Sequence, residues 1–246
     1  MKGIPIREAR EYIHDNIGQF HEKRLRSLQE TKFYDLLKRK NPYLFRAKYI
    51  LTAESLVTSL EAKLSSSEEE IFGEFLEDLA IFVAQKTLGA VKSSTEGLDF
   101  EFTRKNVRYL FAIKSGLNWG NSSQWKALIV SFKRAKQVLN QSRHIKEVKC
   151  FLGISYGKVK RTEKKGFILQ VCGQEFWAVL SGDPKFYSEL IEPIGYKSKE
   201  LNENFKTEKA KIINKFTRDF LNEFCDESGK ILWKKLVKFN SGNMEL

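Results

Sequence analysis

Asp99 and Lys114 are the pair of residues in this chain best placed to act chemically together. Each lies in a short segment in which apolar and other residues alternate. This pattern predicts two strands, over 98–103 and 109–114, that form a hairpin with a turn at Asn106. Because side chains alternate between the two faces of a strand, we expect the carboxylate and the ammonium group to converge on one side of that hairpin.

Further oxygen ligands lie near this pair in the sequence. Glu101 shares the strand face of Asp99, the acidic segment upstream supplies Glu77, and the backbone carbonyl of Ile113 ends the second strand. Carboxylate and carbonyl oxygens are the ligands that Mg²⁺ prefers. Lys114 would orient or deprotonate an attacking water and offset the charge of a phosphorane. The residues therefore predict in-line hydrolysis of a phosphodiester.

The same residues resemble the PD-(D/E)xK nuclease superfamily, in which an acid is followed at a distance by a lysine at the end of an apolar strand. Residues 114–121 (KSGLNWGN) are similar to a signature of PmeII-like type II restriction endonucleases, and the likeness covers roughly residues 70–195. Other parts of the chain also resemble those enzymes: Gln124, residues 172–177 (CGQEFW) and residues 180–183 (LSGD).

The resemblance implies an α/β fold, with a restriction-endonuclease-like core of a central mixed β-sheet flanked by helices. It also implies a type II site-specific deoxyribonuclease that uses Mg²⁺ on double-stranded DNA and leaves 5′-phosphate and 3′-hydroxyl ends. A homodimer and a companion DNA methyltransferase would accompany that activity. Two alternatives stay open: another PD-(D/E)xK nuclease acting on junctions or nonspecific DNA, and a catalytically degenerate DNA-binding protein.

One position departs from the superfamily pattern. An acid is expected two residues before the lysine, and this chain has Ala112 there. Either the missing carboxylate is supplied from elsewhere, with Glu77 and then Glu101 as candidates, or the site is impaired. A helix predicted from residue 65 to Leu88 carries Glu74 and Glu77 on the same side, so either of them could reach the hairpin.

The charge distribution suits a nucleic-acid partner. The formal net charge is +12, with eleven Lys/Arg against two Asp/Glu over 101–150, but three against ten over 51–100. Basic surface attracts the phosphate backbone. The candidate DNA contacts are Ser115, Asn118, Asn121, Gln124, Lys126, Lys158, Lys160 and Arg161. The amides among them are equally compatible with a turn and helix cap, and the cations with an ordinary solvated loop.

Element patterns predict three contiguous regions. Residues 1–64 are a helical region that could contact DNA, 65–195 form the nuclease core, and 196–246 form a C-terminal helical extension packed on the core. Three widely spaced cysteines form no CxxC pair and indicate neither a disulfide framework nor a zinc site. No apolar run approaches the length of a membrane span and no signal peptide is recognisable, so we expect a cytoplasmic protein without membrane contact.

Overall fold

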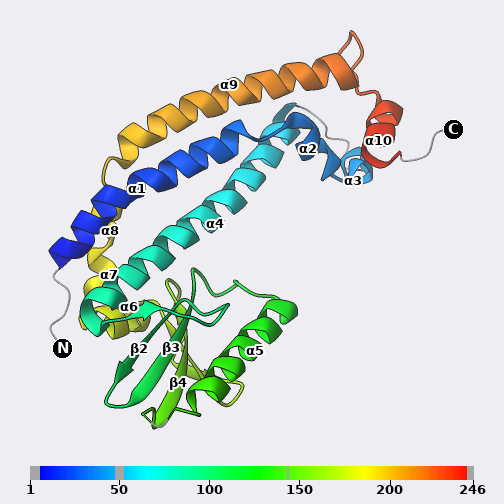
Figure 1. Cartoon of the computed structure of the whole chain (residues 1–246). Helices are drawn as coiled ribbons and strands as arrows, with labels where there is room; N and C mark the ends of the chain where they lie inside the picture. The colour runs from blue at the N-terminus through cyan, green and yellow to red at the C-terminus, as the bar shows by residue number, and fades with distance from the viewer. Residues whose placement is uncertain (1–5, 48–52, 143, 243–246) are drawn as a thin grey trace. The chain divides into compact units, whose positions relative to one another are not determined.

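The structure is a computed structural model that describes residues 6–47, 53–142 and 144–242 (Figure 1). Its helices are α1 (Ile6–Gln29), α2 (Phe33–Lys38), α3 (Pro42–Ala47), α4 (Ala53–Leu88), α5 (Ser122–Leu139), α6 (Gln174–Ser181), α7 (Phe186–Glu189), α8 (Ile191–Ile194), α9 (Ser198–Phe224) and α10 (Trp233–Ser241). Its strands are β1 (Val91–Lys92), β2 (Phe100–Arg104), β3 (Val107–Lys114), β4 (Glu147–Ile154), β5 (Thr162–Lys164) and β6 (Ile168–Cys172).

Within the described residues these strands form one mixed sheet, in the order β1-β2-β3-β4-β6-β5. β3 is parallel to β4 and β4 to β6, whereas the pairs β1–β2, β2–β3 and β5–β6 are antiparallel. Figure 1 shows β2, β3 and β4 side by side, with α5 running along them. The predicted α/β class, with a central mixed sheet flanked by helices, is confirmed.

The predicted hairpin is present as β2 and β3. Only Lys105 and Asn106 connect the two paired strands, and both have a positive φ, of 48° and 61°. Two such residues are what a type I′ turn requires, and this turn matches the natural twist of a hairpin. The turn sets the register, with Phe100 opposite Phe111. The register in turn places Asp99 beside the last residues of β3.

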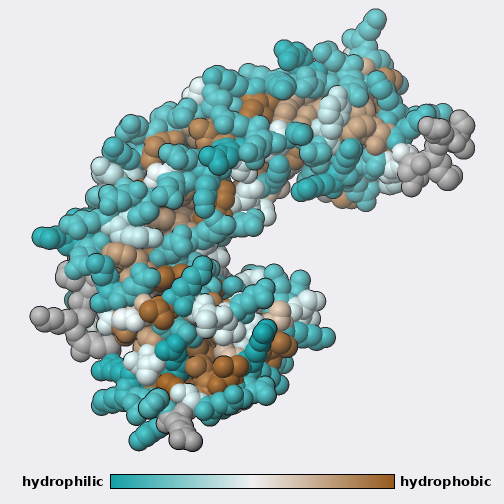
Figure 2. All heavy atoms as spheres, in the orientation of Figure 1, coloured by the Kyte–Doolittle hydropathy of each residue, from teal (hydrophilic) through white to brown (hydrophobic). Residues whose placement is uncertain are grey.

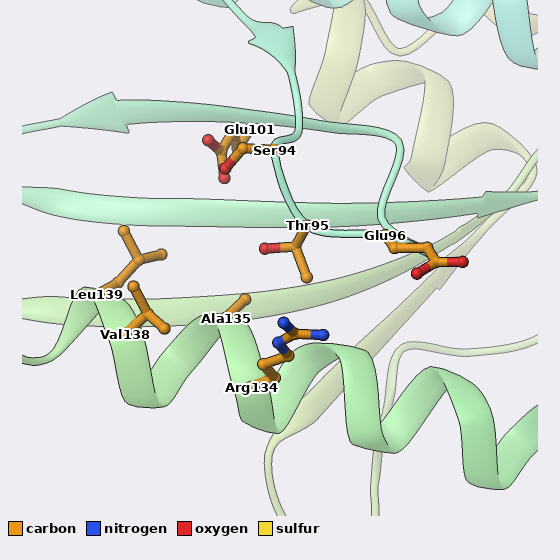
Figure 3. Close-up of a pocket in the computed structure, with 8 residues that line it drawn as sticks. All are labelled: Ser94, Thr95, Glu96, Glu101, Arg134, Ala135, Val138 and Leu139. Atoms are coloured by element: carbon orange, nitrogen blue, oxygen red, sulfur yellow. The ribbon is translucent and has the colours of Figure 1, made fainter.

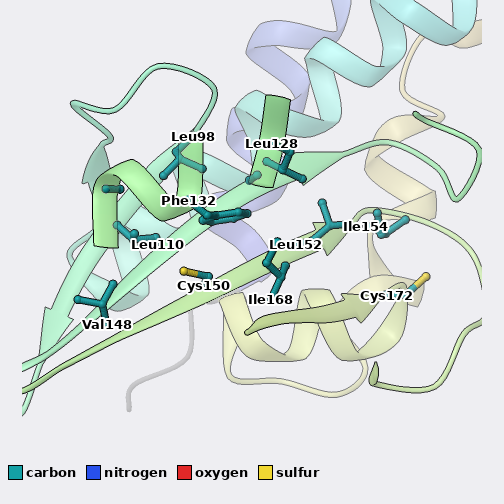
Figure 4. Close-up of a cluster of buried hydrophobic side chains, with 12 residues drawn as sticks. Leu98, Leu110, Leu128, Phe132, Val148, Cys150, Leu152, Ile154, Ile168 and Cys172 are labelled. Carbon is teal, nitrogen blue, oxygen red and sulfur yellow. The ribbon is translucent and has the colours of Figure 1, made fainter. Parts of the chain in front are cut away.

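An apolar cluster joins α5 to one face of the sheet (Figure 4). Leu128, Phe132 and Ala135 follow helical spacing on α5 and are buried. They pack with Leu110 and Ala112 of β3 and with the same face of β4. Removing this apolar surface from water is the main contribution that holds the helix against the strands.

Aromatic rings and α6 occupy the opposite face of the sheet. Phe100, Phe111 and Phe151, from three neighbouring strands, stack with ring centroids 4.6 and 4.7 Å apart. At Gly153 of β4, a Cβ atom would lie 2.3 Å from the ring of Phe176 in α6. Glycine at this position therefore lets α6 pack directly on the strand.

Helix α4 begins earlier than the sequence predicted. The pattern of serines at 65–67 followed by acids indicated a helix start, but the helix already begins at Ala53 and runs without a break to Leu88. Leu60 and Leu64 are buried in a hydrophobic cluster, so tertiary packing keeps the segment before the serines helical. Serines 65–67 lie inside the helix and cap nothing.

Contacts divide the chain into two compact units. One unit consists of the described residues of Met1–Ile17 and Phe72–Tyr196 and contains the sheet, and the other consists of those of Gly18–Ile71 and Lys197–Leu246. The second unit has a core of its own: Leu28, Phe33, Leu36, Leu37, Leu60, Leu64, Phe205, Phe216, Phe220, Phe224 and Leu236. Each unit thus combines segments distant in sequence, whereas the predicted regions 1–64, 65–195 and 196–246 are contiguous. Those regions stay a prediction.

The surface of the molecule is largely polar. Figure 2 shows hydrophilic side chains over most of the visible face, with smaller hydrophobic patches between them. Among the described residues, no helix has both the length and the apolar character that crossing a membrane requires.

Candidate active site

Asp99 lies immediately before β2, where two backbone groups of β3 hold it. Its N–H donates to the carbonyl of Phe111 at 2.8 Å, and its carboxylate Oδ2 accepts the N–H of Ile113 at 2.5 Å. A charge-assisted hydrogen bond of this kind fixes the orientation of a carboxylate. The acid is therefore held at the C-terminal end of β3, close to Lys114.

Glu77 reaches the same place from α4, and its carboxyl group is hydrogen-bonded to that of Asp99. Burial, followed by repulsion from Asp99, raises the pKa of Glu77 to about 7, although Lys114 acts to lower it. Burial also raises the pKa of Asp99, against the lowering effects of the Ile113 N–H and of Lys114. The two acids therefore bind a proton near neutral pH, as expected for carboxyl groups that share one small site.

Two lysines face these acids. The charge of Lys114, the last residue of β3, acts on both carboxyl groups, and its Nζ lies 5.7 Å from the centroid of the Trp119 ring. Lys92 of β1 also lowers the pKa of Asp99. The sequence did not reveal Lys92 as part of the site, because β1 has only two residues and too little alternation to be recognised. Its pairing with Phe100 is what brings it near Asp99.

The backbone carbonyl of Ile113 lies on the side of β3 that faces Asp99. In an extended strand the N–H and C=O of one residue point to the same side, and those of the next residue point to the other. The N–H of Ile113 donates to Asp99, whereas the carbonyl of Lys114 accepts the N–H of Ser155, the residue after β4. The Ile113 carbonyl is thus directed to the side of the strand on which Asp99 lies.

The structure does not bring Glu101 into this group. Its side chain is 7% exposed and forms an ion pair with Arg108 of β3. Ala112 has no exposed surface and packs in the cluster beneath α5. Of the two acids considered as replacements for the one missing at position 112, only Glu77 lies beside Asp99. Glu74, the other acid on that side of α4, is exposed.

The donor set suits a hard divalent cation. Two carboxylates and one backbone carbonyl provide oxygen ligands, and Mg²⁺ commonly binds one or two protein carboxylates while it keeps several waters. In the part of the chain that the structure describes, His, Cys, Asp and Glu side chains form no group of three or more that could hold a metal. Water would have to complete the coordination shell.

The predicted amides after Lys114 include a helix cap. Asn121 is the N-cap of α5, and its Oδ1 accepts the N–H groups of Ser123 and Gln124 at 3.0 Å each. In return, Oε1 of Gln124 accepts the N–H of Asn121 at 2.9 Å, which completes a capping box. The capping alternative that the sequence left open therefore applies to both residues. Asn118, also exposed, precedes the cap.

The predicted DNA-contacting cations lie on or near an open groove. The groove has a volume of about 1040 Å³ and is lined by Lys126 and Trp125 of α5 and by the hairpin of β5 and β6. Lys158 and Lys160 are exposed in the segment before β5, whereas Arg161 forms an ion pair with Glu175 of α6. Positive charge for DNA contact is thus available along this groove, although the charge of Arg161 is already neutralised by Glu175.

Ser115 has a different environment from the other predicted DNA contacts. It is half-buried, and a Cβ atom added to Gly73 of α4 would lie 3.3 Å from its Cβ and its Oγ. The bare backbone at Gly73 therefore allows α4 to approach the segment after β3, one turn before Glu77.

Comparison with known proteins agrees with this geometry. Residues 7–202 match the family model described as Type II restriction endonuclease EcoO109I, and no curated protein matches the chain. The predicted likeness to type II restriction endonucleases of the PD-(D/E)xK type is confirmed, whereas the narrower likeness to PmeII-like enzymes stays a prediction. Because the match covers most of its length, the chain belongs to the EcoO109I family of type II restriction endonucleases.

Proposed function

We propose that this protein cleaves double-stranded DNA at a short specific sequence in a Mg²⁺-dependent reaction, leaving 5′-phosphate and 3′-hydroxyl ends. Its family supports site-specific DNA cleavage in general. The observation that carries the metal-dependent chemistry is the hydrogen-bonded pair of Glu77 and Asp99 beside Lys114. A carboxylate pair with a neighbouring lysine is suited to holding a cation against a phosphate.

The residues of the site have different roles in this proposal. Glu77, Asp99 and the Ile113 carbonyl would hold Mg²⁺, and Glu77 would release its proton as the cation binds. Mg²⁺ held there would lower the pKa of a coordinated water and offset negative charge on the phosphate. Lys114 orients the attacking water and stabilises the charge that develops on the phosphorane. Asp99 keeps its orientation through the Ile113 N–H.

DNA binding would draw on the polar and basic residues that follow β3 and precede β5. Phosphate oxygens are acceptors, so donors are required. The α5 cap engages the side-chain oxygens of Asn121 and Gln124, and their amide nitrogens are donors. The proposed contacts are Ser115, Asn118, Asn121, Gln124, Lys126, Lys158, Lys160 and Arg161.

A palindromic target would match a two-fold symmetric homodimer, in which each copy cuts one strand. We include this assembly in the proposal, together with a companion DNA methyltransferase that protects the host target. The N-terminal region 1–64, predicted from the sequence to be helical, would serve DNA contact or the association of the two copies. Light scattering of the purified protein, with and without duplex DNA, measures the assembly directly.

The deciding experiment digests a mixed set of plasmids with the full chain in Mg²⁺, in EDTA, and as the Lys114→Ala variant. Lys133→Ala, which changes an exposed lysine on α5, is the matched control. We expect discrete fragments from the wild type and from Lys133→Ala, and none in EDTA or from Lys114→Ala. Smears or junction-specific products would replace the proposal with another PD-(D/E)xK nuclease. DNA binding without cleavage would replace it with a degenerate binding protein.

A further inference from the structure

Glu101 is a buried acid for which the proposed mechanism has no use. Its carboxylate lines a cavity of about 420 Å³ between α5 and the loop 93–99, which leads from β1 to Asp99. Figure 3 shows Glu101 beside Ser94 of this loop, while Arg134 projects from α5 on the other side of the cavity. A carboxylate with 6% residue exposure is costly unless it has partners.

Those partners come from two directions. On the hairpin side, Oε1 of Glu101 accepts a hydrogen bond from Nη2 of Arg108, whose Nη1 donates to the Thr103 hydroxyl at 2.8 Å. On the loop side, Oε2 of Glu101 accepts the hydroxyl of Ser93 in a long contact of 3.5 Å. One carboxylate thus contacts both the hairpin and the loop that precedes Asp99.

Ser93 connects this anchorage to Asp99. Its hydroxyl accepts the N–H of Thr95 at 3.2 Å, and its backbone N–H donates to the carbonyl of Asp99 at 3.1 Å. The N–H of Leu98 donates to the carbonyl of Thr95 at 3.1 Å, which tightens the loop further. The hydrogen bond between Ser93 and Asp99 therefore joins the two ends of the loop, and Asp99 carries the proposed metal-binding carboxylate.

We propose that Glu101 is a positioning residue for Asp99. Ion-paired with Arg108, it holds Ser93 and with it the loop, so that the Asp99 carboxylate stays on the Ile113 N–H next to Glu77. The functional consequence rests on the proposed role of Asp99 as a metal ligand, whereas the positioning itself can be measured without metal or DNA. Partners in the surroundings of a metal ligand commonly change metal affinity by about 10- to 100-fold.

The first test is hydrogen exchange of the Ile113 amide in the metal-free full chain. We expect its exchange to rise about tenfold relative to β4 amides in Glu101→Ala and in Ser93→Ala, because the bond to Asp99 opens more often. Glu147→Ala removes an exposed ion pair with Lys149 on β4 and should leave the rate unchanged. An unchanged Ile113 rate, or an equal rise in β4 amides, would overturn the positioning role.

A second set of variants keeps the test decisive if Glu101→Ala fails to fold. Removing Glu101 alone leaves the half-buried Arg108 without its acid, and such an unpaired charge is strongly destabilising. Glu101→Gln keeps the shape and an acceptor for Ser93, whereas Arg108→Met removes the ion pair from the other side. Ile113 exchange near the wild-type rate in Glu101→Gln, against fast exchange in Arg108→Met, supports anchorage by Glu101; no effect in either variant overturns it.

The last test separates positioning from ligation through the Mg²⁺ dependence of cleavage. We expect Arg108→Met to need up to about tenfold more Mg²⁺ and to recover turnover at saturation, and Glu101→Gln to stay near the wild-type Mg²⁺ requirement, with DNA affinity unchanged in both. Asp99→Asn should not recover at any concentration. Complete loss of cleavage in Glu101→Gln at every Mg²⁺ level would identify a direct ligand and overturn the inference. If the wild type itself cleaves no DNA, the proposed function fails, and Ile113 exchange still decides the positioning role.

Discussion

At the scale of single residues, the proposed metal site would set a proton against a cation for the same two acids. Glu77 and Asp99 share a hydrogen bond, and their burial favours the protonated pair. In the proposed mechanism, a divalent cation would bring more charge to the same oxygens and displace the proton. Lys114 and Lys92 add positive charge around Asp99, which reduces the electrostatic repulsion between the two carboxylates.

The role of Glu77 is tested by comparing it with its neighbour on the same helix. Glu77→Gln keeps the size of the side chain but removes the charge that would hold Mg²⁺, so we expect cleavage to fall by about 100-fold or more. Glu74→Gln changes an exposed acid three residues earlier that is not among the proposed metal ligands, so it should leave the rate within about twofold of wild type. Initial cleavage rates on one plasmid measure both. Equal rates in the two variants would remove Glu77 from the site.

The raised pKa of Glu77 also makes stability depend on pH. Between its ordinary pKa of 4.5 and its folded value of about 7, the folded chain keeps a proton that the unfolded chain releases. The contribution of this group is therefore complete below pH 4.5 and disappears as the pH rises through about 7. In EDTA, Glu77→Gln should have a Tm close to that of wild type at about pH 5 and above it at about pH 8. A Tm difference that does not vary with pH would contradict this assignment.

At the scale of elements, the start of α5 combines a structural role with a proposed binding role. Replacing a capping Asn with Ala typically costs about 1 kcal/mol of stability, and Asp caps as well as Asn. We expect Asn121→Ala to lower the free energy of unfolding by about that amount and Asn121→Asp to retain it. Urea unfolding measures the difference.

The Asn121→Asp variant also reports on DNA contact. Asn121→Asp places a negative charge where phosphate is proposed to bind, so it should weaken DNA affinity despite its intact cap. Fluorescence anisotropy with a duplex measures the affinity. If Asn121→Asp binds DNA as tightly as wild type, the residue serves the helix alone.

Elements that follow from local pattern were the ones that the sequence predicted well. The hairpin of β2 and β3 follows from alternation and from a turn at Asn106, and it makes Asp99 and Lys114 converge. The acid on α4 could be named because Glu77 has the right helical phase. The start of α4 at Ala53 could not be predicted, since it depends on packing of distant segments rather than on serine caps.

Side-chain pairing was harder to foresee than backbone pattern. Alternation placed Glu101 on the strand face of Asp99, but it could not tell that Arg108, diagonally across the hairpin, neutralises its charge. The short strand β1 and its Lys92 leave no periodic signal at all. The sequence thus predicted which elements bring the candidate residues together, whereas the partners of individual charges required the folded arrangement.

At the scale of the whole molecule, the net charge of +12 should appear as salt-dependent DNA binding. Removing one lysine that neutralises a phosphate lowers the slope of log affinity against log salt by about 0.9. We expect that reduction for Lys160→Ala, and a smaller one for Arg161→Ala because Glu175 already neutralises Arg161. Anisotropy titrations at several salt concentrations give the slopes. Equal slopes for wild type and Lys160→Ala would exclude Lys160 from the DNA surface.

The two ends of the sheet have a consequence for how copies of this chain can associate. β1 has two residues and β5 has three, and both edge strands carry lysine. Short, charged edge strands offer few unpaired backbone groups and resist pairing with a strand from another molecule. The sheet is thereby protected against edge-to-edge aggregation, and we expect the proposed homodimer not to continue the sheet across two copies.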